Sequence, residues 1–230
     1  TPTSSDVEFT IDPSLSGTIT AGGSSAQSNA QTAWTTAYNA TAKNVTINYD
    51  KSQGSGGGVT NFLSGAYDFA GSDSPLNADQ TAQSKALCTE GGVNIPIYLD
   101  GVAIIFNIPG VTELKLSCET IAKIFALQIT DWSDPAITKD NGTALAAGAI
   151  TTVARSDGSG TTFNFTNYLS KVSGEWKDKV GEGTSVQWPA GIGGKGNEGV
   201  AANVGRIKGA IGYVEYAYAK KNKLTHMQVQ

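Results

Sequence analysis

The feature that most constrains this chain is an alternation of short β-rich runs with longer amphipathic runs in its first part. The β-rich runs are residues 18–21, 45–49 and 69–71, and the amphipathic runs between them are residues 26–41 and 57–63. This βαβαβ order predicts a parallel sheet, because a helical crossover brings each new strand back in the same direction. Residues that follow the carboxyl ends of the strands then share one edge of the sheet, where α/β proteins bind ligands.

A second strand and helix series begins after the pair Gly91 and Gly92. Its predicted strands are 94–99, 102–107, 151–154 and 210–214. Its predicted helices are 119–126, 161–170, 215–221 and a further one that follows the glycine-rich stretch 191–199 and ends at about Val204. Because the series restarts after a glycine pair, we expect a first lobe at 1–92, a second lobe at 93–230, and a cleft between them.

Composition excludes several classes of function. A formal net charge of −4 gives no basic face for nucleic acid. The single histidine, His226, and the wide spacing of Cys88 and Cys118 do not form a metal motif, so we expect no metal and no cofactor. No run approaches the roughly 20 apolar residues of a membrane span. The N-terminus lacks signal-peptide features, which predicts a mature or trimmed start.

Cys88 and Cys118 leave two interpretations open. A disulfide is the preferred one, and two buried thiols are the alternative.

Four segments that follow predicted strands combine glycine with hydroxyl side chains. They are residues 22–25 (GGSS), 54–58 (GSGGG), 71–73 (GSD) and 155–162 (RSDGSGTT). Glycine lets a backbone approach an anion closely, hydroxyls donate hydrogen bonds, and helix N-termini present unpaired N–H groups. Any one such segment is more often an N-cap or a turn. Together they predict an oxyanion site that needs little charge.

The fourth segment is the most specific, and it is similar to a known family signature. RSDGSGT at 155–161, followed by FNFTNYL at 163–169, resembles the phosphate-binding signature of PstS, the receptor of bacterial phosphate ABC transporters. Five more segments are similar to PstS motifs in the same order: 21–25 (AGGSS), 54–59 (GSGGGV), 68–75 (DFAGSDSP), 188–198 (WPAGIGGKGNE) and 209–219 (GAIGYVEYAYA).

The resemblance implies a fold and a ligand. The implied fold is α/β, a two-lobed periplasmic-binding-protein-like fold of type II, in which each lobe is a mostly parallel sheet flanked by helices. The implied phosphate donors are Ser25, the backbone amide of Ala26, Ser55, Ser159, Gly160 and Thr161, with Arg155 as the one cationic contact. The family often has an aromatic residue at position 26, but an alanine keeps the amide.

Two aspartates have distinct expected roles. Asp157 is expected to hold the Arg155 guanidinium in place, although an aspartate there could simply form a turn. Asp73 matches the family's acceptor carboxylate. A carboxylate facing an anion is repulsive unless the anion carries a proton for it to accept, which phosphate does near neutral pH and sulfate does not. Asp73 therefore predicts discrimination against sulfate.

The resemblance implies an extracytoplasmic receptor that delivers inorganic phosphate to the membrane permease of an ABC importer and catalyses nothing. A lipid anchor in the precursor is one further expectation. Family members continue well beyond the match at 209–219, so the first lobe is expected to be incomplete. Two alternatives remain open: a surface interaction protein that keeps the fold, and a phosphate-ester hydrolase. His226, near the C-terminus, gives no sign of a Ser-His-Asp triad.

Overall fold

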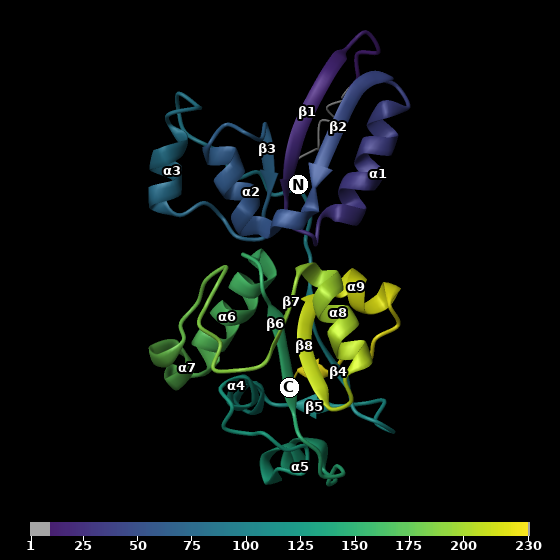
Figure 1. The fold of residues 1–230 in the computed structure, drawn as a ribbon, viewed down its shortest axis with the longest axis vertical. Coiled ribbons are helices and arrows are strands. Elements are labelled where there is room, and N and C mark those ends of the chain that lie inside the picture. Colours follow the sequence, from purple (N-terminus) through teal and green to yellow (C-terminus); the bar gives the residue numbers. More distant parts are fainter. Residues whose placement is uncertain (1–9, 230) are drawn as a thin grey trace, which may run out of the picture.

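Two separate sheets, one above the other in Figure 1, organise the chain. The structure, a computed structural model, describes residues 10–229. We call residues 16–84, which build the first sheet, the first body, and residues 102–229, which build the second, the second body. The segment 93–101 between them forms neither helix nor strand, and its last residue directly precedes the first strand of the second sheet.

The first body is a parallel three-stranded sheet with helices beside it (Figure 1). Its strands are β1 (Ser16–Gly23), β2 (Asn44–Asp50) and β3 (Phe69–Gly71), in the order β2-β1-β3. Its helices are α1 (Ser28–Asn39), the short 3₁₀ turn η1 (Lys51–Gln53), α2 (Gly54–Leu63) and α3 (Ala78–Ser84). Each expected strand and helix of this part is therefore present, within a few residues of its predicted bounds.

The second body is built on a four-stranded mixed sheet with the order β4-β8-β6-β7. The strands are β4 (Val102–Asn107), β6 (Thr151–Arg155), β7 (Ile192–Gly194) and β8 (Ala210–Glu215). Only β4 runs antiparallel to its neighbour, while β6 is parallel to both β7 and β8. A small parallel pair, β5 (Lys115–Leu116) with β9 (Gln228–Val229), lies near the base.

Six helices of the described chain surround this second sheet (Figure 1). They are α4 (Cys118–Phe125), α5 (Pro135–Asn141), α6 (Gly160–Val172), α7 (Gly174–Lys179), α8 (Gly196–Arg206) and α9 (Tyr216–Lys221). The sequence predicted α4, α6, α8 and α9, which end within a few residues of their expected bounds.

An aromatic cluster on one face of the second sheet supports the loop after β6. Phe165 of α6 stacks on Tyr213 of β8 with ring centroids 4.5 Å apart, and Phe125 of α4 meets Phe165 edge-on at 4.8 Å. The Tyr213 hydroxyl accepts the N–H of Arg155 at 3.2 Å and bonds the Thr162 hydroxyl at 2.6 Å. Buried rings each contribute about 1.5–3 kcal/mol through area removed from water. The start of α6 is thereby fixed to the core.

Residues 94–99 do not form the strand that their composition predicted. A strand needs a neighbouring strand to pair its N–H and C=O groups, and this segment has no ladder partner among residues 10–229. Two of its apolar side chains are largely exposed, Ile95 at 74% and Leu99 at 101% of full exposure. Conversely, the sequence did not predict the strand β7, because the glycine-rich stretch 191–199 was interpreted as a turn.

The expected disulfide between Cys88 and Cys118 is wrong. No bond joins the two cysteines, both of which lie in the described part of the chain. Cys88 follows α3 beside the first body, whereas Cys118 is the first residue of α4 in the second body (Figure 1). A disulfide needs Cα atoms about 4.4–6.8 Å apart. Cys118 instead interacts with the Tyr168 side chain of α6.

Among residues 10–229, no helix is both long enough and apolar enough to cross a lipid bilayer.

Candidate anion-binding site

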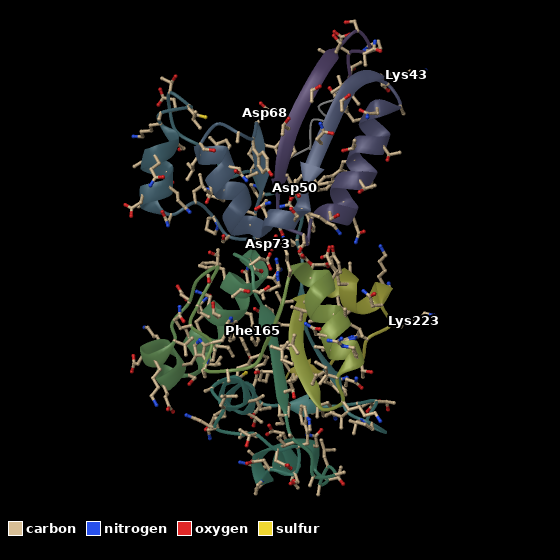
Figure 2. The ribbon with its side chains drawn as sticks, viewed as in Figure 1. Lys43, Asp50, Asp68, Asp73, Phe165 and Lys223 are labelled. Carbon is tan, nitrogen blue, oxygen red and sulfur yellow. The ribbon has the colours of Figure 1, made fainter. Side chains whose placement is uncertain are left out.

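Four loops meet where the two bodies touch. They are residues 24–27 after β1, 51–55 after β2 (the 3₁₀ turn η1 and the first two residues of α2), 72–75 after β3 and 156–159 after β6. Each follows the carboxyl end of a parallel strand, which is why three of them share one edge of the first sheet and the fourth faces them from the second. Figure 2 shows Asp73 at this junction. The topology therefore brings together the four segments that the sequence singled out.

Asp73 is held by donors from both bodies. The Thr161 hydroxyl of α6 lies 3.2 Å from Asp73 Oδ2, and the Asn164 amide donates to the Asp73 carbonyl at 2.7 Å. The Asp73 N–H points at the Ser55 hydroxyl of α2, at 3.4 Å. Burial raises the pKa of the Asp73 carboxyl above its ordinary value, opposed by hydrogen bonds from Ser24 and Thr161. This carboxyl is thus a stronger proton acceptor than an exposed aspartate.

Gly160, the first residue of α6, lies against the first body. A Cβ added to it would fall 2.7 Å from each of three atoms: Asp73 Cβ, the Asp73 nitrogen and the Ser55 Oγ. Real Cβ atoms do not approach other atoms this closely. Only glycine therefore lets the N-terminus of α6 come this near to the loop after β3.

Gly54 plays the corresponding role at the start of α2. Its φ of +64° lies in the left-handed region, and a Cβ there would meet the Gly158 carbonyl oxygen at 2.4 Å. The next glycine along the helix, Gly56, donates its N–H to that same carbonyl at 3.0 Å. Backbone contact between α2 and the loop before α6 therefore closes one side of the junction.

Arg155 and Asp157 form a forked ion pair inside the site. Arg155 Nε donates to Asp157 Oδ1 at 2.7 Å, and Nη2 donates to Oδ2. The side chains are only 2% and 11% exposed. Burial alone would raise the pKa of Asp157, but the guanidinium and the Gly196 N–H outweigh it and hold the pKa below its ordinary value. A charged carboxylate therefore orients the guanidinium.

The hydroxyls of Ser159 and Thr161 belong to the start of α6. Ser159 is fully buried and caps the helix, since its Oγ accepts the Thr162 N–H at 3.0 Å. The 13-residue α6 directs the positive end of its dipole at the junction. This end favours an anion, as the sequence predicted from the GSGTT stretch.

Ser25 and Ala26 lie in the loop after β1 and are both buried. The Ala26 N–H, expected to reach the ligand, points at Ser24 Oγ at 3.2 Å. Ser25 contacts the second body: its Oγ accepts from the side chain of Asn197, at 2.9 Å. Sequence reasoning missed Asn197. The signal available was its place at the start of a helix within the glycine-rich motif 188–198.

The groups around the junction are ones that hold an anion. Buried hydroxyls, helix-terminal N–H groups, one guanidinium and one acceptor carboxylate surround the junction. His226 lies elsewhere, with its ring against Tyr216 and its backbone bridged to β4. Within the described part of the chain, His, Cys, Asp and Glu form no group of three or more able to hold a metal ion.

Comparison with known proteins agrees with this geometry. A family profile described as a PBP superfamily domain matches residues 10–229. The chain belongs to the PBP superfamily. This membership confirms the expected periplasmic-binding-protein-like α/β fold, and the members that the chain resembles are named as phosphate-binding proteins.

Two curated relatives illustrate the similarity. The chain is 49% identical to the phosphate-binding protein PstS of Pasteurella multocida over 216 residues, which is 93% of this chain and 60% of that protein. It is 49% identical to PstS of Xylella fastidiosa (strain 9a5c) over 200 residues, or 86% of this chain and 53% of the relative. The resemblance to the PstS family is confirmed. The chain spans a little over half the length of these relatives.

Among solved structures, the chain superposes on a phosphate-binding protein from Stenotrophomonas maltophilia with a TM-score of 0.67. That likeness covers 93% of this chain and 65% of the other, at 23% sequence identity. At this identity the likeness supports the fold.

Proposed function

We propose that this PBP superfamily member is the phosphate receptor of an ABC importer, a protein that binds inorganic phosphate between its bodies and does no chemistry on it. The observation that carries the proposal is Asp73, a carboxyl with a raised pKa set among hydroxyl donors and opposite a buried guanidinium. A site for any anion gains nothing from such a carboxyl. A site for an anion that carries a proton gains a hydrogen bond.

In this proposal the ligand lies between Ser25, Ala26 and Ser55 of the first body and Arg155, Ser159, Gly160 and Thr161 of the second. Asp157 supports Arg155. The two lobes are residues 1–92 and 93–230. The receptor works outside the cytoplasm and delivers phosphate to a membrane permease. PstS relatives of 49% identity support this placement, and one solved neighbour is named as a periplasmic phosphate-binding protein.

Calorimetric titration of the folded chain with phosphate and with sulfate tests the proposal. We expect saturable binding of phosphate at one site per chain and weaker binding of sulfate. If folded protein releases no heat and shows no thermal stabilisation with millimolar phosphate, the proposal is wrong. A parallel assay with a phosphate monoester separates the hydrolase alternative, because the receptor predicts no turnover.

A further inference from the structure

Asn197, the second residue of α8, connects the second body to a proposed ligand residue of the first. It is fully buried. Its side chain and its backbone N–H both contact Ser25 Oγ, at 2.9 Å and 3.2 Å. Ser25 lies in the loop after β1, so this contact crosses the junction between the bodies.

The orientation of the Asn197 amide follows from its other partner. The backbone N–H of Glu215, at the end of β8, donates to Asn197 Oδ1 at 2.8 Å. Since an N–H can only donate, the atom facing it must be the amide oxygen. The NH₂ group of Asn197 must then face Ser25, and Ser25 Oγ must accept from it.

The same logic fixes the Ser25 hydroxyl hydrogen. A hydroxyl has two acceptor lone pairs and one hydrogen to donate. Both lone pairs of Ser25 Oγ are used, one by the Asn197 amide and one by the Asn197 N–H. The hydrogen is left to donate, and no hydrogen bond of residues 10–229 gives it a protein acceptor. The Tyr218 hydroxyl also donates to the Ser25 carbonyl at 2.8 Å, which fixes the backbone.

We infer that Asn197 is a positioning residue for anion binding: it occupies both lone pairs of the Ser25 hydroxyl, so that the hydrogen is donated to the bound anion. The inference rests on the proposed function. Hydrogen bonds received by a hydroxyl also polarise it and strengthen the bond it donates. Because Asn197 and Ser25 belong to different bodies, the donor is oriented when the bodies are in contact.

Asn197→Asp reverses this arrangement with almost no change of shape. The oxygen that accepts from Glu215 N–H is retained, but a carboxylate oxygen replaces the NH₂ group and accepts the Ser25 hydrogen. The anion then loses a donor and faces an added negative charge. We expect the dissociation constant for phosphate to rise by at least about tenfold near neutral pH.

The test is a double-mutant cycle with Ser25→Ala, read out by calorimetry with inorganic phosphate. If Asn197 acts through the Ser25 hydroxyl, Asn197→Asp has a smaller effect in the Ser25→Ala background than in the wild-type one, because only the repulsion between the new carboxylate and the anion remains. Asn203→Asp is the matched control, because it places the same charge change on α8 at a side chain that bonds only Gly193 and Arg206. It should leave affinity within about twofold.

A pH series adds a readout that a purely structural role would not change. Protonation of the introduced carboxylate restores a donor toward Ser25. The ratio of variant to wild-type dissociation constants should therefore fall as the pH is lowered through the pKa of that carboxylate. It should fall less when Ser25 is alanine, because only the repulsion between the carboxylate and the anion then titrates. Asn197→Ala, which adds no charge, is measured in the same double-mutant cycle with Ser25→Ala. If one of the two Asn197 variants fails to fold, the other still tests the positioning role.

Three outcomes separate the two claims. Non-additive losses with the expected pH series support the positioning role. Wild-type binding with additive losses, or with none, overturns the role of Asn197 and leaves the receptor proposal standing. Failure of the folded wild-type chain to bind phosphate overturns both.

Discussion

Replacing Asp73 with asparagine tests the selectivity of the site. In the wild-type chain the Asp73 carboxyl accepts from the Thr161 hydroxyl at 3.2 Å and from Ser24, and burial raises its pKa. Toward a protonated phosphate it accepts a charge-assisted hydrogen bond of about 1.5–3 kcal/mol. Toward sulfate it offers only a negative charge. An asparagine amide can accept from phosphate or donate to sulfate, so it removes most of this difference.

The expected change is a loss of selectivity. At about 1.4 kcal/mol per factor of ten, Asp73→Asn should lower the ratio of phosphate to sulfate affinity by about 10- to 100-fold. Competition calorimetry with the two anions measures that ratio directly. Asp131→Asn is the control: this carboxylate caps a turn through Ser133, away from the junction, and its loss should leave the ratio unchanged. An Asp73→Asn variant with unaltered selectivity would refute the assignment of Asp73 as the acceptor.

Three further predictions follow from the same contacts. Arg155→Lys keeps the positive charge but loses the two hydrogen bonds to the Asp157 carboxylate. It should weaken phosphate binding and lower the free energy of unfolding, measured by urea titration, by about 1–3 kcal/mol. A variant with wild-type stability would contradict this prediction. Gly160→Ala should abolish binding, because the new Cβ meets Asp73 at 2.7 Å, while a retained dissociation constant would count against the close approach. Burial raises the pKa of Asp100 from 3.8 to about 7, and the nearby Glu215 adds to the rise. The protonated form therefore stabilises the fold at low pH, and this stability is lost as the pH rises from 3.8 through about 7. The melting temperature should fall over this pH range, and Asp100→Asn should make the fall shallower; an unchanged slope would contradict the raised pKa of Asp100.

The strands of the two larger sheets other than β7, and the helices α1, α2, α4, α6, α8 and α9, could be predicted because each has its own periodicity and its own breaks. Helix α6 follows the capping serine Ser159, and β3 is a short apolar run that ends at the glycine of a GSD turn. Parallel strands then place their carboxyl-end loops together without further information. The loops after β1, β2 and β3 could therefore be placed together from the sequence, whereas the position of the loop after β6 opposite them followed from the resemblance to a two-lobed family.

What the sequence could not predict depends on contacts between distant segments. The run 94–99 has strand composition, but pairing requires a neighbour that composition does not supply. The sequence favoured a disulfide between Cys88 and Cys118, but Cys88 lies beside the first body and Cys118 lies in the second, which the sequence alone does not show. Asn197 was missed for the same reason: its three hydrogen bonds join residues 25, 197 and 215, which no local pattern connects.

A crystal structure of the chain grown with saturating phosphate would show directly whether the anion binds between the two bodies. We expect one phosphate at their junction, within hydrogen-bond distance of Ser25, Ser55, Thr161 and the Arg155 guanidinium, with one oxygen directed at Asp73. A folded chain that binds phosphate at another place, or that leaves this junction without phosphate at saturating concentration, would contradict it.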